Sequence, residues 1–173
     1  MTYYYQPTAN SRDLSGQTQT ASIDVGSGTG YFDFSSGSQV TPANPGASID
    51  WDLAFSSYEI MQNCGPNGPG SCVAWPAYTE LTGDPTDIDA FTTQPADAPM
   101  FPDFIKSVFV GDLVNENENW YDYDGTTHQI SSSGNIYLVK VGDVIYKLSI
   151  ESYYGNVDGV PTSAHYTFVW NEL

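Results

Sequence analysis

One short segment constrains the fold of this chain more than any other, the run I-D-W-D-L-A-F at residues 49–55. Trp51, Leu53 and Phe55 recur at every second position, so they share one face of a β-strand. The two aspartates of the run alternate with them and fall on the other face. We expect the aromatic face to pack in a core and the aspartate face to meet solvent or a partner.

The apolar pattern moves by one position directly after this run. Ser56 and Ser57 come next, and the apolar side chains resume at Tyr58 and Ile60. A single strand absorbs such a shift only through a bulge or a break, because side chains alternate strictly between its faces. We therefore predict a strand over residues 50–62 with a bulge at the two serines.

The composition supports an all-β domain. The 173 residues include 13 Tyr, 8 Phe and 4 Trp beside 16 Gly and 11 Pro, which favours strands joined by turns. No apolar stretch is long enough for a transmembrane helix, and the first residues lack the basic and apolar segments of a signal peptide. We expect residues 1–19 to be a flexible polar lead-in and residues 20–173 to form one antiparallel domain, as two packed sheets or a flattened barrel.

Alternation and turn residues also place the other early elements. We expect strands at about 20–25, 30–35 and 72–79. Four prolines and several aspartates make the stretch 80–102 a long surface connection, because proline cannot donate to a sheet ladder. Residues 104–113 fit either a short strand or a helical turn.

The C-terminal third has the clearest pattern. A two-residue turn at Gly142 and Asp143 would make a hairpin of residues 136–154, with glycine at the first central position as a type II′ turn prefers. Both faces of this hairpin carry apolar residues, which indicates a central position in a layered structure. One face is expected to hold Val139, Val141, Val144, Tyr146, Leu148 and Ile150, and the other Ile136, Leu138 and Ile145. The last strand, 164–170, directs Tyr166, Phe168 and Trp170 to one face, and Trp51 and Trp120 should be buried.

The charge of the chain excludes some partners. Four basic residues stand against 21 acidic ones, so nucleic acid and anionic membranes are unsuitable partners. The acidic residues fit a solvated, soluble surface. A calcium site is the alternative, because Asp122 and Asp124, or the aspartates within 84–89, place carboxylates at short spacing. Neither run has the twelve-residue loop with a closing Glu that a common calcium motif requires.

Cys64 and Cys72 are the two cysteines of the chain. The seven residues between them include three Gly and two Pro, so the spacer can reverse direction. A disulfide in an oxidising compartment is the favoured interpretation, and reduced thiols or a metal site are the alternatives. A metal site would need two further ligands, and no C-x-x-C motif or nearby His is present.

The sequence offers little for catalysis. No G-x-S-x-G, H-E-x-x-H, P-loop or dinucleotide fingerprint occurs, and the two histidines stand in unrelated contexts. Nothing singles out a pair of carboxylates for glycoside hydrolysis. We therefore expect a protein that is not an enzyme.

The order of these segments resembles the HmuY-like family of exported bacterial haem-binding proteins, over roughly residues 20–171. The resemblance implies an exported protein that is periplasmic, anchored to the outer membrane as a lipoprotein, or extracellular. It also implies haem or a related porphyrin as ligand, a role in iron acquisition, and an outer-membrane receptor as partner. The residues that carry it are T-A-S-I-D at 20–24, G-Y-F-D-F-S at 30–35, W-D-L-A-F and N-C-G at 51–65, residues 89–95, W-Y-D-Y at 120–123 and the strands at 136–154.

The resemblance further implies that two His or Met side chains hold the haem iron from loops at one end of the β structure. Candidates here are His128, Met100 and His165. Each has a simpler interpretation: His128 as an exposed turn residue, His165 as part of a strand face, and Met100 as a loop residue packed on the core. Met61 is expected to pack beside the cysteine loop.

Four tyrosines could line the ligand site, Tyr121, Tyr123, Tyr153 and Tyr154. An exposed aromatic cluster of this kind can also stack on sugar rings or peptides. The alternative function is therefore a carbohydrate- or protein-binding surface module without haem. Calcium could assist binding in such a module.

Overall fold

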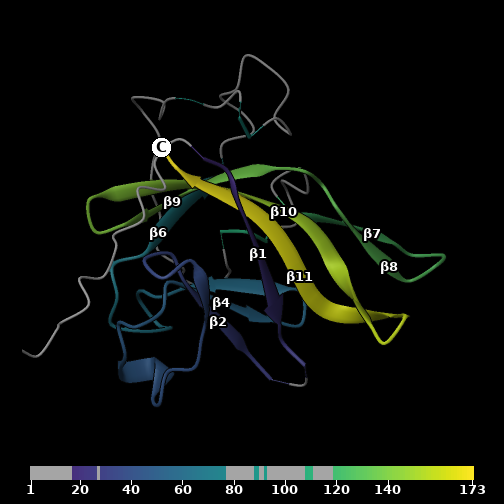
Figure 1. Cartoon of the computed structure of the whole chain (residues 1–173), viewed down its shortest axis with the longest axis horizontal. Coiled ribbons are helices and arrows are strands. Elements are labelled where there is room, and N and C mark those ends of the chain that lie inside the picture. Colours follow the sequence, from purple (N-terminus) through teal and green to yellow (C-terminus); the bar gives the residue numbers. More distant parts are fainter. Residues whose placement is uncertain (1–16, 27, 77–87, 90–91, 93–107, 111–118) are drawn as a thin grey trace, which may run out of the picture.

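The computed structural model describes residues 17–26, 28–76, 88–89, 92, 108–110 and 119–173. Eleven strands and one short 3-10 helix, η1, make up its regular structure (Figure 1). None of its helices is long and apolar enough to cross a membrane within these ranges. The elements are β1 (Gln19–Asp24), β2 (Gly30–Asp33), β3 (Ser38–Val40), η1 (Pro45–Ala47), β4 (Leu53–Ser56), β5 (Glu59–Gln62), β6 (Val73–Pro76), β7 (Tyr121–Asp124), β8 (Gln129–Ser132), β9 (Ile136–Val141), β10 (Val144–Val157) and β11 (Val160–Glu172).

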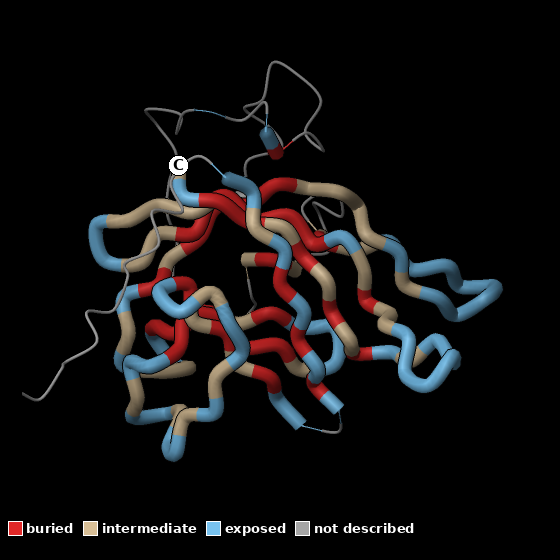
Figure 2. The backbone as a smooth tube through the Cα atoms, viewed as in Figure 1, coloured by how far each residue is buried: buried red, intermediate tan, exposed pale blue. Residues whose placement is uncertain are grey.

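The strands form three antiparallel sheets. Five strands make the largest, in the order β1-β11-β10-β9-β6, and four make the second, in the order β3-β2-β4-β5. The third is the hairpin of β7 and β8. This architecture confirms the all-β prediction: the two larger sheets pack face to face, with buried residues between them, and neither closes into a barrel (Figures 1 and 2).

Aromatic rings fill the space between the two larger sheets. Phe32 of β2 and Phe55 of β4 are fully buried, and both contact Phe168 of β11, with ring centroids 5.0 and 5.5 Å apart. Trp51 and Trp120 are 2% and 1% exposed, as their sequence positions predict. Each large ring removes roughly 150–250 Å² of surface from water, so this cluster supplies much of the hydrophobic stabilisation.

The five-stranded sheet carries apolar residues on both faces, as the pattern of the C-terminal third predicts. Its outer face holds a smaller cluster of Trp75, Ile88, Ile136 and Leu138. The turn at Gly142 and Asp143 joins β9 to β10, and only the glycine has a positive φ, +59°. The inner face holds Val139, Val141, Tyr146, Leu148 and Ile150 together with Tyr166, Phe168 and Trp170.

The predicted bulge at Ser56 and Ser57 is wrong, because the chain reverses there. Ser56 pairs with Glu59 across a two-residue turn, and Ser57 has a φ of +53°. A bulge and a two-residue turn produce the same one-residue shift of the apolar pattern in the sequence. In the hairpin it places Phe55 opposite Ile60, so both side chains reach the core.

The aspartate face of the W-D-L-A-F strand is buried at Asp52 and Ala54, contrary to the sequence-based expectation, while Asp50 is exposed. Asp52 is only 6% exposed, and its carboxylate accepts a hydrogen bond from the backbone N–H of Phe34 at 2.8 Å. Burial raises the pKa of Asp52 to about 6, with a further contribution from the nearby charge of Asp33. The bond from Phe34 opposes this shift without cancelling it.

Sequence reasoning missed or misplaced several elements. The short strand β3 has no clear period and was not expected, while β10 and β11 extend well beyond their predicted ends. The connection at 80–102 and the segment 104–113 fall largely outside the described residues, as do residues 1–16 of the predicted lead-in. The expectation of a single domain over residues 20–173 stays a prediction.

Asn63 holds the loop between the two cysteines against the strand before it. The side chain is 1% exposed; its amide donates to the backbone oxygens of Ser48 and Trp51, and its Oδ1 accepts from the N–H of Gly70 at 3.1 Å. A Cβ on Gly70 would lie 2.5 Å from the Asn63 backbone oxygen. A glycine at this position therefore allows the loop to close tightly.

Both cysteines are buried at the ends of this loop. Cys64 is 5% exposed and Cys72 is 1% exposed, and the backbone N–H of Cys72 donates to the oxygen of Asn63 at 3.3 Å. The structure contains no disulfide among its described residues. The predicted bridge therefore stays a prediction.

The disulfide prediction can be checked by mass. Protein recovered from an oxidising compartment should be lighter by two hydrogens than the same protein after reduction, because the flexible spacer lets the sulfurs approach. Replacing both cysteines by serine should lower the melting temperature without changing ligand binding. An unchanged mass after reduction would contradict the bridge.

Replacing Asp52 by Asn should change how stability depends on pH. The folded state holds a proton on Asp52 more strongly than the unfolded chain does, so stability falls as pH rises from about 4 to about 6. Asp52→Asn should remove this fall and add on the order of 2 to 3 kcal/mol at pH 7. Urea unfolding at a series of pH values measures the difference, with exposed Asp50→Asn as the control. Equal pH profiles for wild type and Asp52→Asn would refute the prediction.

Replacing Asn63 by Ala should destabilise the protein strongly. Buried backbone oxygens and one N–H would lose their partners, at a cost of roughly 2 to 4 kcal/mol. Asn44→Ala is the matched control, because Asn44 is exposed and its side chain makes no cap hydrogen bond. Thermal and urea unfolding should separate the two variants, and similar losses in both would count against a specific role for Asn63.

Candidate functional site

The β7–β8 hairpin brings together several of the candidate ligand-binding side chains. Tyr121 pairs with Ser132 and Tyr123 pairs with Ile130, so these four residues lie on one face of the hairpin. Figure 1 shows the hairpin projecting beside the far end of β10 and β11. We call these four residues, together with the neighbouring Tyr58, the hairpin face.

The hairpin face continues outward from the core. Trp120, at its base, is buried and donates through Nε1 to the backbone oxygen of Tyr58 at 2.9 Å. The Tyr121 ring lies 5.0 Å from Trp120 and 5.8 Å from Tyr58, between centroids. Exposure rises along this row, and Tyr58 and Tyr123 reach 43% and 57%. The aromatic surface is thus anchored at one end and open at the other.

Tyr123 and His128 form a hydrogen-bonded pair at the open end. The Tyr123 hydroxyl lies 2.6 Å from Nδ1 of His128, and both side chains are exposed. His128 has a φ of +58°, in the left-handed region, and its N–H donates to the backbone oxygen of Asp124 at 2.8 Å. Histidine tolerates this region better than most residues. The turn therefore folds His128 back toward Tyr123.

Asp124 stabilises the turn rather than standing free as a ligand. Its Oδ1 accepts hydrogen bonds from the N–H groups of Thr126 and Thr127 at 2.7 and 3.2 Å. These bonds hold the pKa of the Asp124 carboxyl below its usual value. In the described part of the chain, no group of three His, Cys, Asp or Glu is placed to hold a metal ion. The calcium suggestion at Asp122 and Asp124 gains no support from this geometry.

The other two candidate tyrosines differ from each other. Tyr154 of β10 accepts a hydrogen bond on its hydroxyl from the Ile130 N–H at 3.2 Å, and so ties the hairpin to the large sheet. Tyr153 is 8% exposed and packs in the core against Trp120 and Tyr166. The expectation that Tyr153 is exposed is therefore wrong.

The two candidate iron ligands that the structure describes, His128 and His165, do not come together. His165 lies on β11 opposite Asp24 of β1, with Nε2 3.5 Å from the Asp24 carboxylate. It belongs to the large sheet, whereas His128 belongs to the hairpin. Met100 lies outside the described residues, and Met61 is half-buried on β5.

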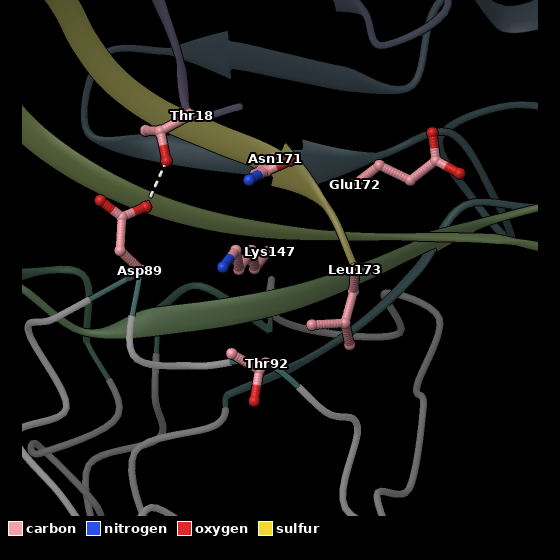
Figure 3. A pocket seen from close by; sticks show the side chains of 7 residues that line it. All are labelled: Thr18, Asp89, Thr92, Lys147, Asn171, Glu172 and Leu173. Carbon is pink, nitrogen blue, oxygen red and sulfur yellow. Dashed lines mark hydrogen bonds between the residues drawn. The ribbon is translucent and has the colours of Figure 1, made fainter. Parts of the chain in front are cut away.

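A polar cavity of about 530 Å³ lies elsewhere, on the outer face of the five-stranded sheet (Figure 3). Lys147 and Asn171 are paired on β10 and β11 and extend toward Asp89, which accepts a hydrogen bond from Thr18. The Glu172 side chain points away. No aromatic, His, Cys or Met residue is found among its described lining, so this cavity is poorly suited to an iron porphyrin.

Sequence reasoning identified Tyr121, Tyr123 and His128 but could not connect them. It missed Tyr58, which lies 62 residues from Trp120 in the chain and joins it through a backbone oxygen. The pairing of Lys147 with Asn171 was also missed, because these two residues lie far apart in the sequence. The one local signal was the turn-forming D-G-T-T-H run at 124–128, which fits a hairpin that returns His128 to Tyr123.

Comparison with known proteins agrees with the fold. The model of the HmuY protein family matches residues 28–170. Among solved structures, the crystal structure of an apo HmuY analog from Tannerella forsythia is similar at a TM-score of 0.60 and 14% identity, covering 91% of this chain and 97% of that chain. No curated protein matches the chain by sequence. The family match spans most of the sequence, and the chain belongs to the HmuY family.

Proposed function

We propose that this protein binds haem or a related porphyrin on the hairpin face and is not an enzyme. A porphyrin is a flat, largely apolar ring, so it needs a flat apolar surface and, for its iron, a donor atom at the edge of that surface. The hairpin face offers the tyrosine row for the ring and the Tyr123–His128 pair for the iron. That pair, at the open end of an anchored aromatic surface, is the observation that carries the proposal.

Membership of the HmuY family supports the same ligand, because the family resemblance implies haem binding. Export, attachment to the outer membrane and an outer-membrane receptor follow as parts of this proposal. The acidic surface of the protein is unfavourable for haem, because the two propionates of haem are anionic. We propose that they point to solvent, where water screens their repulsion from a chain of net charge −17.

The tyrosine row also suits a sugar ring, because sugars stack on exposed aromatic side chains. Tyr58 and Tyr123 are the two most exposed rings of the hairpin face, so they would carry such a contact. Retention on a glycan array without any change in the absorption of added haemin would favour this second function.

Porphyrin titration tests the proposal directly. Protoporphyrin IX and haemin should both quench the tryptophan fluorescence of the protein, because Trp120 lies at the base of the hairpin face. Tyr121→Ser should weaken binding of both compounds by roughly tenfold or more, since it removes one stacking ring worth about 1 to 1.5 kcal/mol and part of the apolar contact. His165→Ala is the control and should bind as the wild type does. Failure of both compounds to bind would rule out the proposed function.

A further inference from the structure

We propose that the polar cavity on the outer face of the five-stranded sheet is a second ligand site, which binds a small zwitterion of the α-amino acid type. The described residues that line this cavity of about 530 Å³ are those labelled in Figure 3. A volume of this size is usual for a small-molecule site, for which about 300 to 1,000 Å³ is typical.

The cavity is separate from the hairpin face. Lys147 pairs with Asn171 near the end of β11, whereas Tyr154, which holds the hairpin, pairs with Ser163. The positions of Lys147 and Tyr154 lie roughly 20 Å apart along β10, at the rise of about 3.3 Å per residue of a strand. Occupation of one site therefore leaves the other open.

Two buried polar side chains form the floor of the cavity. Lys147 is 5% exposed and Asn171 is 4% exposed, and they lie opposite each other on β10 and β11. Lysine is rarely buried to this extent unless it faces an anionic group. Ile145 and Val169, at the preceding outer positions of the same two strands, are apolar and pack on the outer cluster. The polar floor is thus a local departure from an otherwise apolar surface.

Asn171 supplies the observation that points to a ligand. Its Oδ1 is buried and accepts no hydrogen bond from any described group. Folded proteins satisfy nearly all such atoms, because a buried amide oxygen without a partner is destabilising. Figure 3 shows the amide nitrogen directed into the same space as the ammonium of Lys147. Whichever way the amide is turned, it offers one donor group and one acceptor, so a ligand with both an acceptor and a donor satisfies it.

The rim of the cavity carries the opposite charge. Thr18, Asp89 and Thr92 are exposed, and the Asp89 carboxylate accepts a hydrogen bond from the Thr18 hydroxyl. Glu172 also lines the cavity, but its side chain points away (Figure 3). Among the described lining residues, Asp89 is therefore the acid that faces a bound molecule.

A cation on the floor and a carboxylate at the rim define the chemistry of the ligand. The carboxylate of the ligand lies against Lys147 and the Asn171 amide, and its ammonium lies toward Asp89. An α-amino acid carries both groups on one carbon and is neutral overall, so it avoids the repulsion between simple anions and a chain of net charge −17. A sugar suits this cavity less well, because the described lining has no aromatic ring for stacking.

The two charged contacts differ in strength. Opposite charges attract more strongly where water is excluded, so the contact on the buried floor stabilises the complex more than the contact with the exposed Asp89. We therefore expect loss of the ligand carboxylate to weaken binding more than loss of its ammonium.

Calorimetric titration with the common L-amino acids, one at a time, tests the site. At least one should bind the wild-type protein and raise its melting temperature, as a ligand of the folded state does. The analogue of that amino acid without the ammonium should bind roughly tenfold more weakly. The analogue without the carboxylate should bind about 100-fold more weakly.

Substitutions in the cavity test the same contacts from the side of the protein. Asn171→Leu keeps the size of the side chain and removes the unsatisfied oxygen, so it should fold and bind the amino acid at least about tenfold more weakly. Lys147→Met keeps the aliphatic chain and should abolish the preference for ligands with a carboxylate. Lys140→Met is the matched control, because Lys140 belongs to the neighbouring β9 and is not among the lining residues. Each variant should bind porphyrin as the wild type does.

Three results would overturn the inference. The first is folded wild-type protein that binds none of the amino acids at millimolar concentration. The second is a deaminated analogue that binds as tightly as the amino acid, which would indicate a site for simple anions. The third is Asn171→Leu that binds the amino acid with wild-type affinity.

Discussion

The packing of aromatic rings across two sheets is the contact on which the rest of the structure depends. Phe168 lies between Phe32 and Phe55, so one residue of the large sheet contacts two strands of the small sheet. Short strands of four residues cannot bury enough surface by themselves to remain ordered. Their stability comes from this shared core. The same core extends through Tyr166 to Trp120, whose ring centroids are 5.3 Å apart, and so reaches the base of the hairpin that carries the candidate site.

Much of the fold could be predicted from local patterns, because alternation in a strand depends only on neighbours in the chain. Tyr166, Phe168 and Trp170 entered the core as expected for that reason. The interpretation failed at Ser57, where a turn and a bulge leave the same trace in the sequence. It also failed for Asp52, since the burial of an aspartate depends on a backbone donor, Phe34, that lies 18 residues away.

Three residues of the candidate site, Tyr121, Tyr123 and His128, could be predicted from the sequence, but their geometry could not. His128 is an exposed turn residue, the simpler of the two interpretations of its sequence, and the structure adds the bond to Tyr123. Nothing in the spacing of the two residues requires that bond. It depends on a left-handed backbone conformation and on a carboxylate that organises the turn. Tyr153, in contrast, was expected in an exposed aromatic cluster, and the structure packs it in the core against Trp120 and Tyr166.

The β7–β8 hairpin forms a sheet of its own, and no strand of the two larger sheets pairs with it. The exposed residues at its outer end, such as Tyr123 and His128, lie outside the aromatic core. Substitution there removes little core packing, so the proposed binding surface can change at little cost to folding. The similarity of fold to a relative with 14% identity is what such independence would permit. Such a surface can diverge while the two-sheet architecture is kept.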